Sequence, residues 1–109
     1  MTKQEAIQEI TRRLIEYYHP DRIYLFGSEA RGEAGPDSDL DFLVVVPDGT
    51  PEEKFREGYR TLSGIGIAAD VIPWKTSDFV GRATYVKASL PATVVREGRL
   101  LYDARTVAA

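Results

Sequence analysis

The chain has 109 residues, which is the size of one compact domain, and we treat residues 1–109 as a single domain. Hydrophobic residues make up 43% of it and charged residues 28%, as in an ordinary globular protein with a buried core. The net charge of −3 and the lack of clustered Lys and Arg argue against nucleic acid as a partner. The absence of cysteine excludes disulfides, thiolate catalysis and Cys-ligated zinc.

The sequence shows no targeting or membrane segment. Its first residues, MTKQEAIQEITRR, are too polar for a signal peptide, and no apolar run approaches 18 residues. We therefore expect no membrane span and a cytoplasmic location.

The first predicted element is a helix over residues 3–18. Thr2 and Glu5 have the spacing of a capping box, which marks the beginning of a helix. Apolar residues then follow at helical spacing, at Ile7, Ile10, Leu14 and Tyr17. The loop sequence His19-Pro20-Asp21 ends the helix.

Two strands are predicted next, with a polar segment between them. RIYLF (22–26) is the first strand, and Gly27-Ser28 ends it, with Ser28 as the candidate N-cap of a short helix over EARGEA. LDFLVVV (40–46) is apolar on both faces beyond Asp41. Such a run is typical of a central strand that is covered on both sides.

A further helix and a third strand follow. Thr50-Pro51-Glu52-Glu53 is a second capping box, with Pro at the first helical position. The helix after it has an apolar stripe made of Phe55, Tyr59 and Leu62. IAADVIPW (67–74) is the third predicted strand.

The last part of the sequence predicts helix and a final short strand. Ser77 is the candidate cap of a helix with an apolar side formed by Phe79, Val80, Ala83 and Val86. Pro91 interrupts or restarts the helix, Gly98 ends it, and LLY (100–102) is a candidate strand. This order of elements predicts one α/β or α+β domain.

Three carboxylates are candidates for a metal site. Asp39 and Asp41 share a face if their strand begins by residue 39, and about 6.7 Å would then separate their Cα atoms. Two ionised carboxylates at that distance repel by about 2.5 kcal/mol at an effective dielectric of about 20, and a divalent cation relieves this repulsion. Asp70 lies among apolar residues of the 67–74 strand, where a buried acid needs a partner. If the two strands are neighbours, the three acids match a two-metal phosphoryl-transfer site.

The polar segment between the first two strands is a candidate phosphate site. Gly27 lets backbone N–H groups approach a phosphate, Ser28 adds a hydroxyl, and Arg31 adds a cationic contact. Taken alone, however, Gly27-Ser28 is more often a plain strand-to-helix turn, and an isolated Asp-x-Asp pair more often belongs to a turn and a solvated strand end. A P-loop is excluded, because Glu33-Ala34 stands where that motif requires Lys-Ser/Thr.

Together, these pieces resemble the nucleotidyltransferase superfamily related to DNA polymerase β, and most closely its minimal nucleotidyltransferases (MNT proteins). The resemblance lies in Gly27-Ser28 after a strand, Ala30-Arg31-Gly32, Ser38-Asp39-Leu40-Asp41 before an apolar strand, and Asp70 in another strand. It covers nearly the whole chain. It implies an α+β (α/β-like) nucleotidyltransferase fold, in which a mixed β-sheet packs against helices, and the use of Mg²⁺ and ATP.

The resemblance also implies a role for each matching residue. Gly27 and Ser28 would hold the triphosphate, and Arg31 would contact a phosphate. Asp39 and Asp41 would ligate the metals of a two-metal Mg²⁺ site, and Asp70 would be the third carboxylate, positioning or activating the acceptor hydroxyl. The reaction would be in-line attack of that hydroxyl on the α-phosphorus, with pyrophosphate as the leaving group.

The resemblance finally implies a partner. MNT proteins commonly occur beside a small all-helical HEPN protein as the antitoxin of a toxin–antitoxin pair, in some cases adenylylating a tyrosine of the toxin. We therefore expect AMP transfer from ATP to a protein hydroxyl. The alternative is a non-catalytic antitoxin that masks its partner sterically, and transfer to a small molecule is a weaker third reading. Because 39 residues (109 − 70) follow Asp70, a partner or a second copy, in a homo-oligomer, is expected to complete the substrate pocket.

Overall fold

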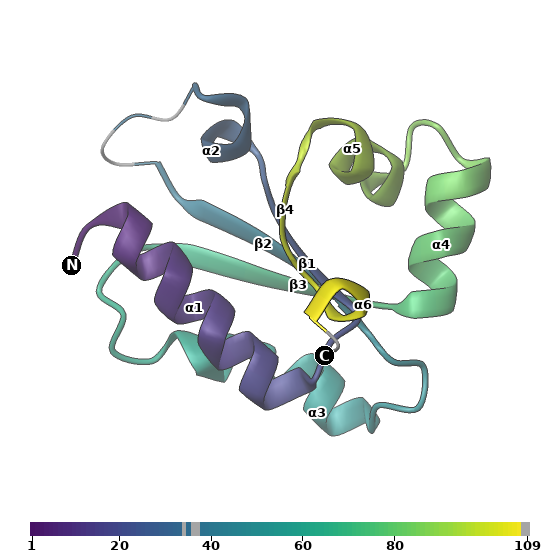
Figure 1. Ribbon diagram of the computed structural model, residues 1–109, viewed down its shortest axis with the longest axis horizontal. Helices are drawn as coiled ribbons and strands as arrows, with labels where there is room; N and C mark the ends of the chain where they lie inside the picture. Colours follow the sequence, from purple (N-terminus) through teal and green to yellow (C-terminus); the bar gives the residue numbers. More distant parts are fainter. Residues whose placement is uncertain (34, 36–37, 108–109) are drawn as a thin grey trace.

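The computed structural model describes residues 1–33, 35 and 38–107, and in this part of the chain four strands form one sheet. In spatial order the strands are β3 (Ala69–Lys75), β2 (Leu40–Val46), β1 (Arg22–Phe26) and β4 (Arg99–Asp103). β1 runs antiparallel to β2 and β4, whereas β2 and β3 are parallel (Figure 1). The mixed sheet of the predicted α+β class is therefore confirmed.

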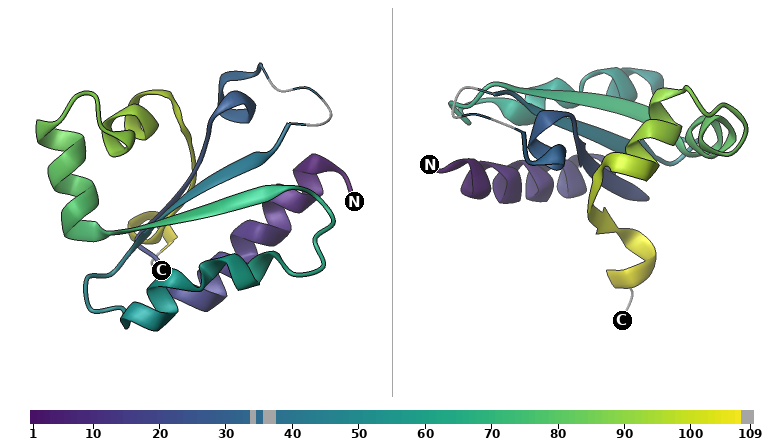
Figure 2. Two further views of the ribbon diagram at one scale, coloured as in Figure 1. Left: turned by 180° about the vertical axis from the view of Figure 1, so that it is seen from behind. Right: turned by 90° about the horizontal axis from the view of Figure 1, so that it is seen from above.

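Helices of unequal length surround this sheet. They are α1 (Lys3–Tyr18), α2 (Ser28–Arg31), α3 (Glu52–Arg56), α4 (Thr76–Tyr85), α5 (Leu90–Glu97) and α6 (Ala104–Val107), with a 3-10 helix, η1 (Gly58–Leu62). The views in Figures 1 and 2 show α1 lying along the sheet and α2 and α4 on opposite sides of the molecule. None of the helices in the described ranges is long and apolar enough to cross a membrane.

The predicted first helix is confirmed as α1, together with its capping box. The hydroxyl of Thr2 accepts a hydrogen bond from Glu5 N at 3.1 Å, and Thr2 N donates to the Glu5 carboxylate at 2.8 Å. The buried residues of α1 are Ala6, Ile7, Ile10, Leu14 and Tyr18. Tyr18, rather than the predicted Tyr17, is therefore the last buried residue of the stripe. Its hydroxyl donates to the carbonyl of Phe55 at 2.6 Å.

The sheet has two covered faces, because successive side chains of a strand point to opposite sides. The first face packs against α1 and is formed by Ile23, Leu25, Leu40, Phe42, Val44 and Val46. The second face is formed around Tyr24, Leu43 and Val45. Phe79 of α4 and Val94 of α5 cover it. β2 is thus a central strand buried on both faces, as its sequence predicted.

The predicted N-caps of two helices are wrong. α3 begins one residue later than expected, and in α4 the side chain of Asp48, which is distant in sequence, takes the place of the expected cap. α3 begins after Pro51, and no side chain caps it, so Thr50 is not its N-cap. α4 begins at Thr76, after Lys75 as the N-cap residue. Ser77 N donates to the side chain of Asp48 at 2.9 Å, so a carboxylate from the preceding loop satisfies a backbone donor in the first turn of α4.

The predicted stripe of Phe55, Tyr59 and Leu62 is broken. The helix ends at Arg56 and a 3-10 helix follows, which changes the number of residues per turn. Tyr59 consequently lies 59% exposed, while Phe55 and Leu62 pack against the core. The 3-10 helix begins at Gly58, where a Cβ atom would clash with the Tyr18 hydroxyl.

The predictions for the last elements are mostly confirmed. Pro91 restarts the helix as α5, whose N-cap Ser89 accepts a hydrogen bond from Ala92 N at 3.2 Å. Gly98 ends α5, and the LLY segment lies within β4. Within α4, Phe79 is buried but Val80 is 53% exposed, so the predicted apolar side of that helix is narrower than expected.

Candidate active site

Two of the predicted carboxylates lie side by side at the start of parallel strands. Asp41 of β2 pairs with Asp70 of β3, and on its other side with Phe26 of β1. Directly paired residues share a face of the sheet, so Phe26, Asp41 and Asp70 form one row on the second face. Asp41 is partly buried on the central strand, whereas Asp70 is exposed on the edge strand. The expectation that these strands are neighbours is confirmed.

Asp39 lies outside the strand, contrary to the geometry that we expected. β2 begins at Leu40, whose N–H donates to the carbonyl of Ala68 at 3.0 Å. Asp39 is the exposed residue before that bond, so the strand rule for residues two apart does not place it on the same face as Asp41. It remains close enough for its charge to act on Asp41.

The row is electrostatically unfavourable for Asp41. Burial raises the pKa of the Asp41 carboxyl, and the negative charges of Asp70 and then Asp39 raise it further. No hydrogen-bond donor or cation from the described residues offsets this rise. The three acids therefore share an excess of negative charge that the described part of the chain does not neutralise.

Gly27 brings the glycine-serine turn against the carboxylates. Its φ of +77° lies in the left-handed region, which favours glycine. A Cβ atom at this position would lie 2.5 Å from Oδ2 of Asp41. Both the backbone conformation and the space thus require glycine here, and the missing side chain gives access to the carboxylate.

Ser28 does not cap a helix, and in this respect the prediction is wrong. Gly27 occupies the N-cap position of α2, and no side chain makes a capping hydrogen bond. The helix extends only to Arg31, because Gly32 in the left-handed conformation ends it before the predicted EARGEA segment is complete. The Ser28 hydroxyl is therefore not used in capping, and its contact with a phosphate stays a prediction.

Arg31 is 43% exposed in its side chain, and it contacts the carboxylate of Glu33 at 3.3 Å. The phosphate contact predicted for it would have to replace this surface ion pair, which is worth little in water. The role of Arg31 also stays a prediction.

The chemistry of the row fits a hard divalent cation. Carboxylate oxygens are preferred ligands of Mg²⁺, and a cation would remove the repulsion that raises the pKa of Asp41. Across residues 1–33, 35 and 38–107, however, no three His, Cys, Asp or Glu side chains converge closely enough to hold an ion as they stand. Asp39, Asp41 and Asp70 accordingly remain predicted ligands.

One residue near this site, Lys3, was not predicted from the sequence. Lys3, in the first turn of α1, contacts the side chain of Glu29 at 3.3 Å and the carbonyl of Gly35 at 2.5 Å. Contacts between residues so far apart in sequence leave no local pattern by which Lys3 could be predicted.

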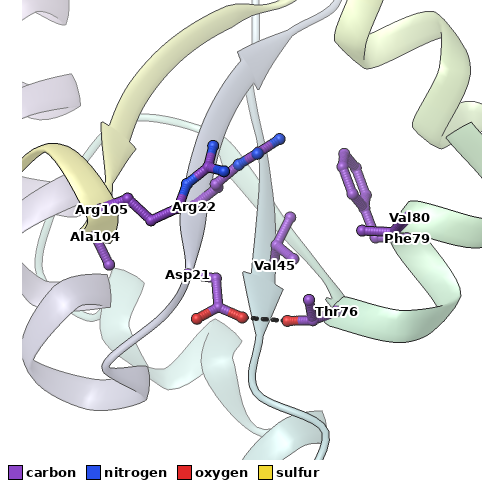
Figure 3. A pocket seen from close by; sticks show the side chains of 8 residues that line it. All are labelled: Asp21, Arg22, Val45, Thr76, Phe79, Val80, Ala104 and Arg105. Carbon is purple, nitrogen blue, oxygen red and sulfur yellow. Dashed lines mark hydrogen bonds between the residues drawn. The ribbon is translucent and has the colours of Figure 1, made fainter.

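A separate pocket of about 240 Å³ lies at the other end of β1 and β2 (Figure 3). Its lining residues are Asp21, Arg22, Val45, Thr76, Phe79, Val80, Ala104 and Arg105, and none of them belongs to the predicted site. The hydroxyl of Thr76 donates to the Asp21 carboxylate, as Figure 3 shows. Arg22 and Arg105 pair with Asp103 at 3.6 and 3.0 Å. Charged groups at this end are thus matched within the chain.

Solved structures with the same fold give the wider setting. One, a toxin–antitoxin with AMP-PNP, is 22% identical, with a TM-score of 0.60 over 95% of this chain and 76% of that one. Another, described as a candidate nucleotidyltransferase from Sulfolobus solfataricus, is 20% identical, with a TM-score of 0.58 over 93% and 80%. A mutant of the toxin–antitoxin MntA-HpeT is 18% identical, with a TM-score of 0.50 over 95% and 74%. At these identities the likeness shows the fold.

The family is shown by the sequence itself. No curated protein matches the chain. A model of the nucleotidyltransferase domain matches residues 7–100, a range that contains the glycine-serine turn and the carboxylate row. The chain therefore belongs to the nucleotidyltransferase domain family.

Proposed function

We propose that the chain transfers AMP from ATP, with Mg²⁺, to a hydroxyl group of a partner protein, as the antitoxin of a HEPN/MNT-type pair. The observation that carries the proposal is the Asp41–Asp70 pair, whose charge the described residues leave uncompensated and against which Gly27 packs closely. The membership of the nucleotidyltransferase domain family supports it. Two structures with this fold, which are toxin–antitoxins, one of them with AMP-PNP, also support it.

In this proposal Asp39 and Asp41 hold Mg²⁺ through their carboxylates. The ion, when bound, would neutralise charge that develops on the triphosphate as the adenylyl group is transferred. Because ligand carboxylates must be ionised, the raised pKa of Asp41 makes ion binding weaken as the pH falls. Gly27 and Ser28 place the triphosphate beside the row, since the turn contacts Asp41 directly.

Asp70 is assigned to the acceptor. It is exposed on the edge strand β3, so a hydroxyl from another protein reaches it more readily than it reaches the partly buried Asp41. The hydroxyl oxygen attacks the α-phosphorus while Asp70 orients it and accepts its proton. One O–P bond forms as the bond to pyrophosphate breaks, and positioning supplies much of the rate.

The test uses ATP labelled at the α-phosphate, Mg²⁺, and the protein encoded by the neighbouring gene. We expect label on that protein with the wild type, and none with Asp70→Asn. Asp78→Asn is the matched control, because it neutralises an exposed acid of α4 outside the site. If the wild type and Asp70→Asn neutralise the neighbour equally and neither transfers label, the chain acts by steric masking and the proposal is wrong.

A further inference from the structure

Lys3 connects the first turn of α1 to both halves of the segment that carries the predicted site. Its Nζ atom lies 3.3 Å from the Glu29 carboxylate and donates to the Gly35 carbonyl at 2.5 Å. Glu29 belongs to α2, directly after Gly27-Ser28. One ammonium group thus joins α1, α2 and the chain that leads to Asp39. Figure 1 shows the start of α1 close to this segment.

The Gly35 contact continues to the carboxylates through a short turn. Gly35 N donates to the hydroxyl of Ser38 at 3.0 Å, and Ser38 N donates to the Gly35 carbonyl at 3.2 Å. Ser38 immediately precedes Asp39. The residue whose carbonyl accepts from Lys3 is therefore hydrogen-bonded to Ser38, the neighbour of Asp39.

The other end of this connection is firmly held. The capping box of Thr2 and Glu5 fixes the backbone on both sides of Lys3. Ala6, Ile7 and Ile10 anchor the following turns in the core. The side chains of Lys3 and Glu29 are only 23% and 21% exposed, so their ion pair is better shielded from water than most surface pairs.

We propose that Lys3 is a positioning residue, which keeps the glycine-serine turn and Asp39 at fixed positions relative to each other for nucleotide binding. It acts through Glu29 and Gly35 and does not itself touch the substrate. Gly27 packs against Asp41, but among the described hydrogen bonds only those of Lys3 connect residues 27–33 and 35 to another helix, since the others there are local or involve Ser38. The role in nucleotide binding rests on the proposed function, whereas the mechanical role does not.

The first arm of the test measures hydrogen–deuterium exchange without ligand. In Lys3→Met, which keeps the aliphatic stem but removes the donors, we expect about tenfold faster exchange at the amides of residues 31–33 and 38, with α1 and β2 unchanged. Arg12→Met is the matched control, because Arg12 also lies on α1 but pairs only with Glu9 and Glu16 among the described residues. Equal exchange in the two variants overturns the proposal.

The second arm measures kinetics with ATP. We expect Lys3→Met to raise KM for ATP about tenfold, with a smaller fall in kcat, because misplaced binding groups weaken the productive complex. Lys3→Arg, which keeps the charge, should recover most of this loss. A KM for Lys3→Met equal to that of Arg12→Met overturns the positioning role even if exchange is faster.

A second variant protects the test against misfolding. Glu29→Gln leaves Lys3 and its Gly35 contact in place and removes only the ion pair, so we expect a smaller change of the same kind in both measurements. No change in Glu29→Gln, together with global loss of protection in Lys3→Met, means that Lys3 serves folding alone and overturns the proposal. Absence of transfer by the wild type contradicts the proposed function, while the exchange arm still decides the mechanical role.

Discussion

The two ends of the sheet treat acidic residues in opposite ways. At one end, Asp41 faces Asp70 across parallel strands, and its pKa is raised by burial and by like charge. At the other end, Asp103 is buried but accepts hydrogen bonds from Arg105, and the charges of Arg105 and Arg22 help to hold its pKa below the usual value. An acid that the chain has already paired is part of the structure. An acid such as Asp41, which lies beside other acids, is favoured to bind a cation that supplies the missing positive charge.

The largest expected effect is the loss of activity in Asp41→Asn. Charge stabilisation by a metal contributes several kcal/mol, and each 1.36 kcal/mol is tenfold in rate, so we expect transfer to fall by at least about 10³-fold. Folding should be preserved or improved, because the substitution removes like-charge repulsion. Measuring transfer beside thermal unfolding tests both parts. A variant with wild-type activity would show that Asp41 is not a metal ligand and that the two ends of the sheet do not differ in function.

Gly27→Ala should damage the same end through geometry. The positive φ disfavours alanine, and its Cβ atom would meet Asp41 Oδ2 at 2.5 Å. Strain of this kind costs about 1–3 kcal/mol in stability, and displacement of the carboxylate is expected to lower activity about 10²-fold. Gly32→Ala is the control: it has the same backbone strain at positive φ but no clash, because the space around Gly32 is open. Equal activity of the two variants would show that the contact with Asp41 is unimportant.

Mg²⁺ should stabilise the wild type through the carboxylate end alone. At about 100 times its dissociation constant, a ligand of the native state adds about 2.7 kcal/mol to the unfolding free energy. We expect the melting temperature of the wild type and of Asp103→Asn to rise with Mg²⁺, and that of Asp41→Asn to stay constant. An equal rise in Asp41→Asn would place the ion elsewhere.

The smallest effect is the pH dependence of stability, which should have opposite signs at the two ends. Because the folded pKa of Asp41 is raised, its contribution to stability falls as the pH rises from 3.8 through that pKa. Because the folded pKa of Asp103 is lowered, its contribution is present above 3.8 and is lost as the pH falls through that pKa. Urea unfolding of Asp41→Asn and Asp103→Asn from about pH 3 to about pH 7 checks both signs. Parallel profiles would contradict the difference between the ends.

Much of this fold was predictable because local patterns determine it. The stripe of Ile7, Ile10 and Leu14 and the capping box before it led to α1, and the apolar run 40–46 led to a central strand. The pairing of Asp41 with Asp70 could be anticipated only as a condition, since strand order depends on contacts between distant segments. The condition, that the two strands are neighbours, holds because a helical crossover makes β2 and β3 parallel and adjacent.

The features that were predicted wrongly, or not at all, have a common physical cause. Ser77 has the local signature of a cap, but Asp48 reaches the first turn of α4 from another loop. Asp39 has the spacing of a strand residue, but the ladder begins one residue later, at Leu40. Lys3 carries no motif at all, and its role depends on two partners that only folding brings together. Contacts of this kind are set by tertiary structure, which local spacing does not encode.

Thr76 attaches the start of α4 to the sheet. Its hydroxyl joins Asp21 and the carbonyl of Val46, so the start of α4 is fastened to the strands beneath it. At the other end of the sheet, Lys3 makes the described side-chain hydrogen bonds that connect Glu29 and Gly35 to α1. The second face thus has a helix fastened to it at the end opposite the predicted site. Grafted loops or reporter groups are therefore best placed on the α4 side, away from Asp41 and Asp70.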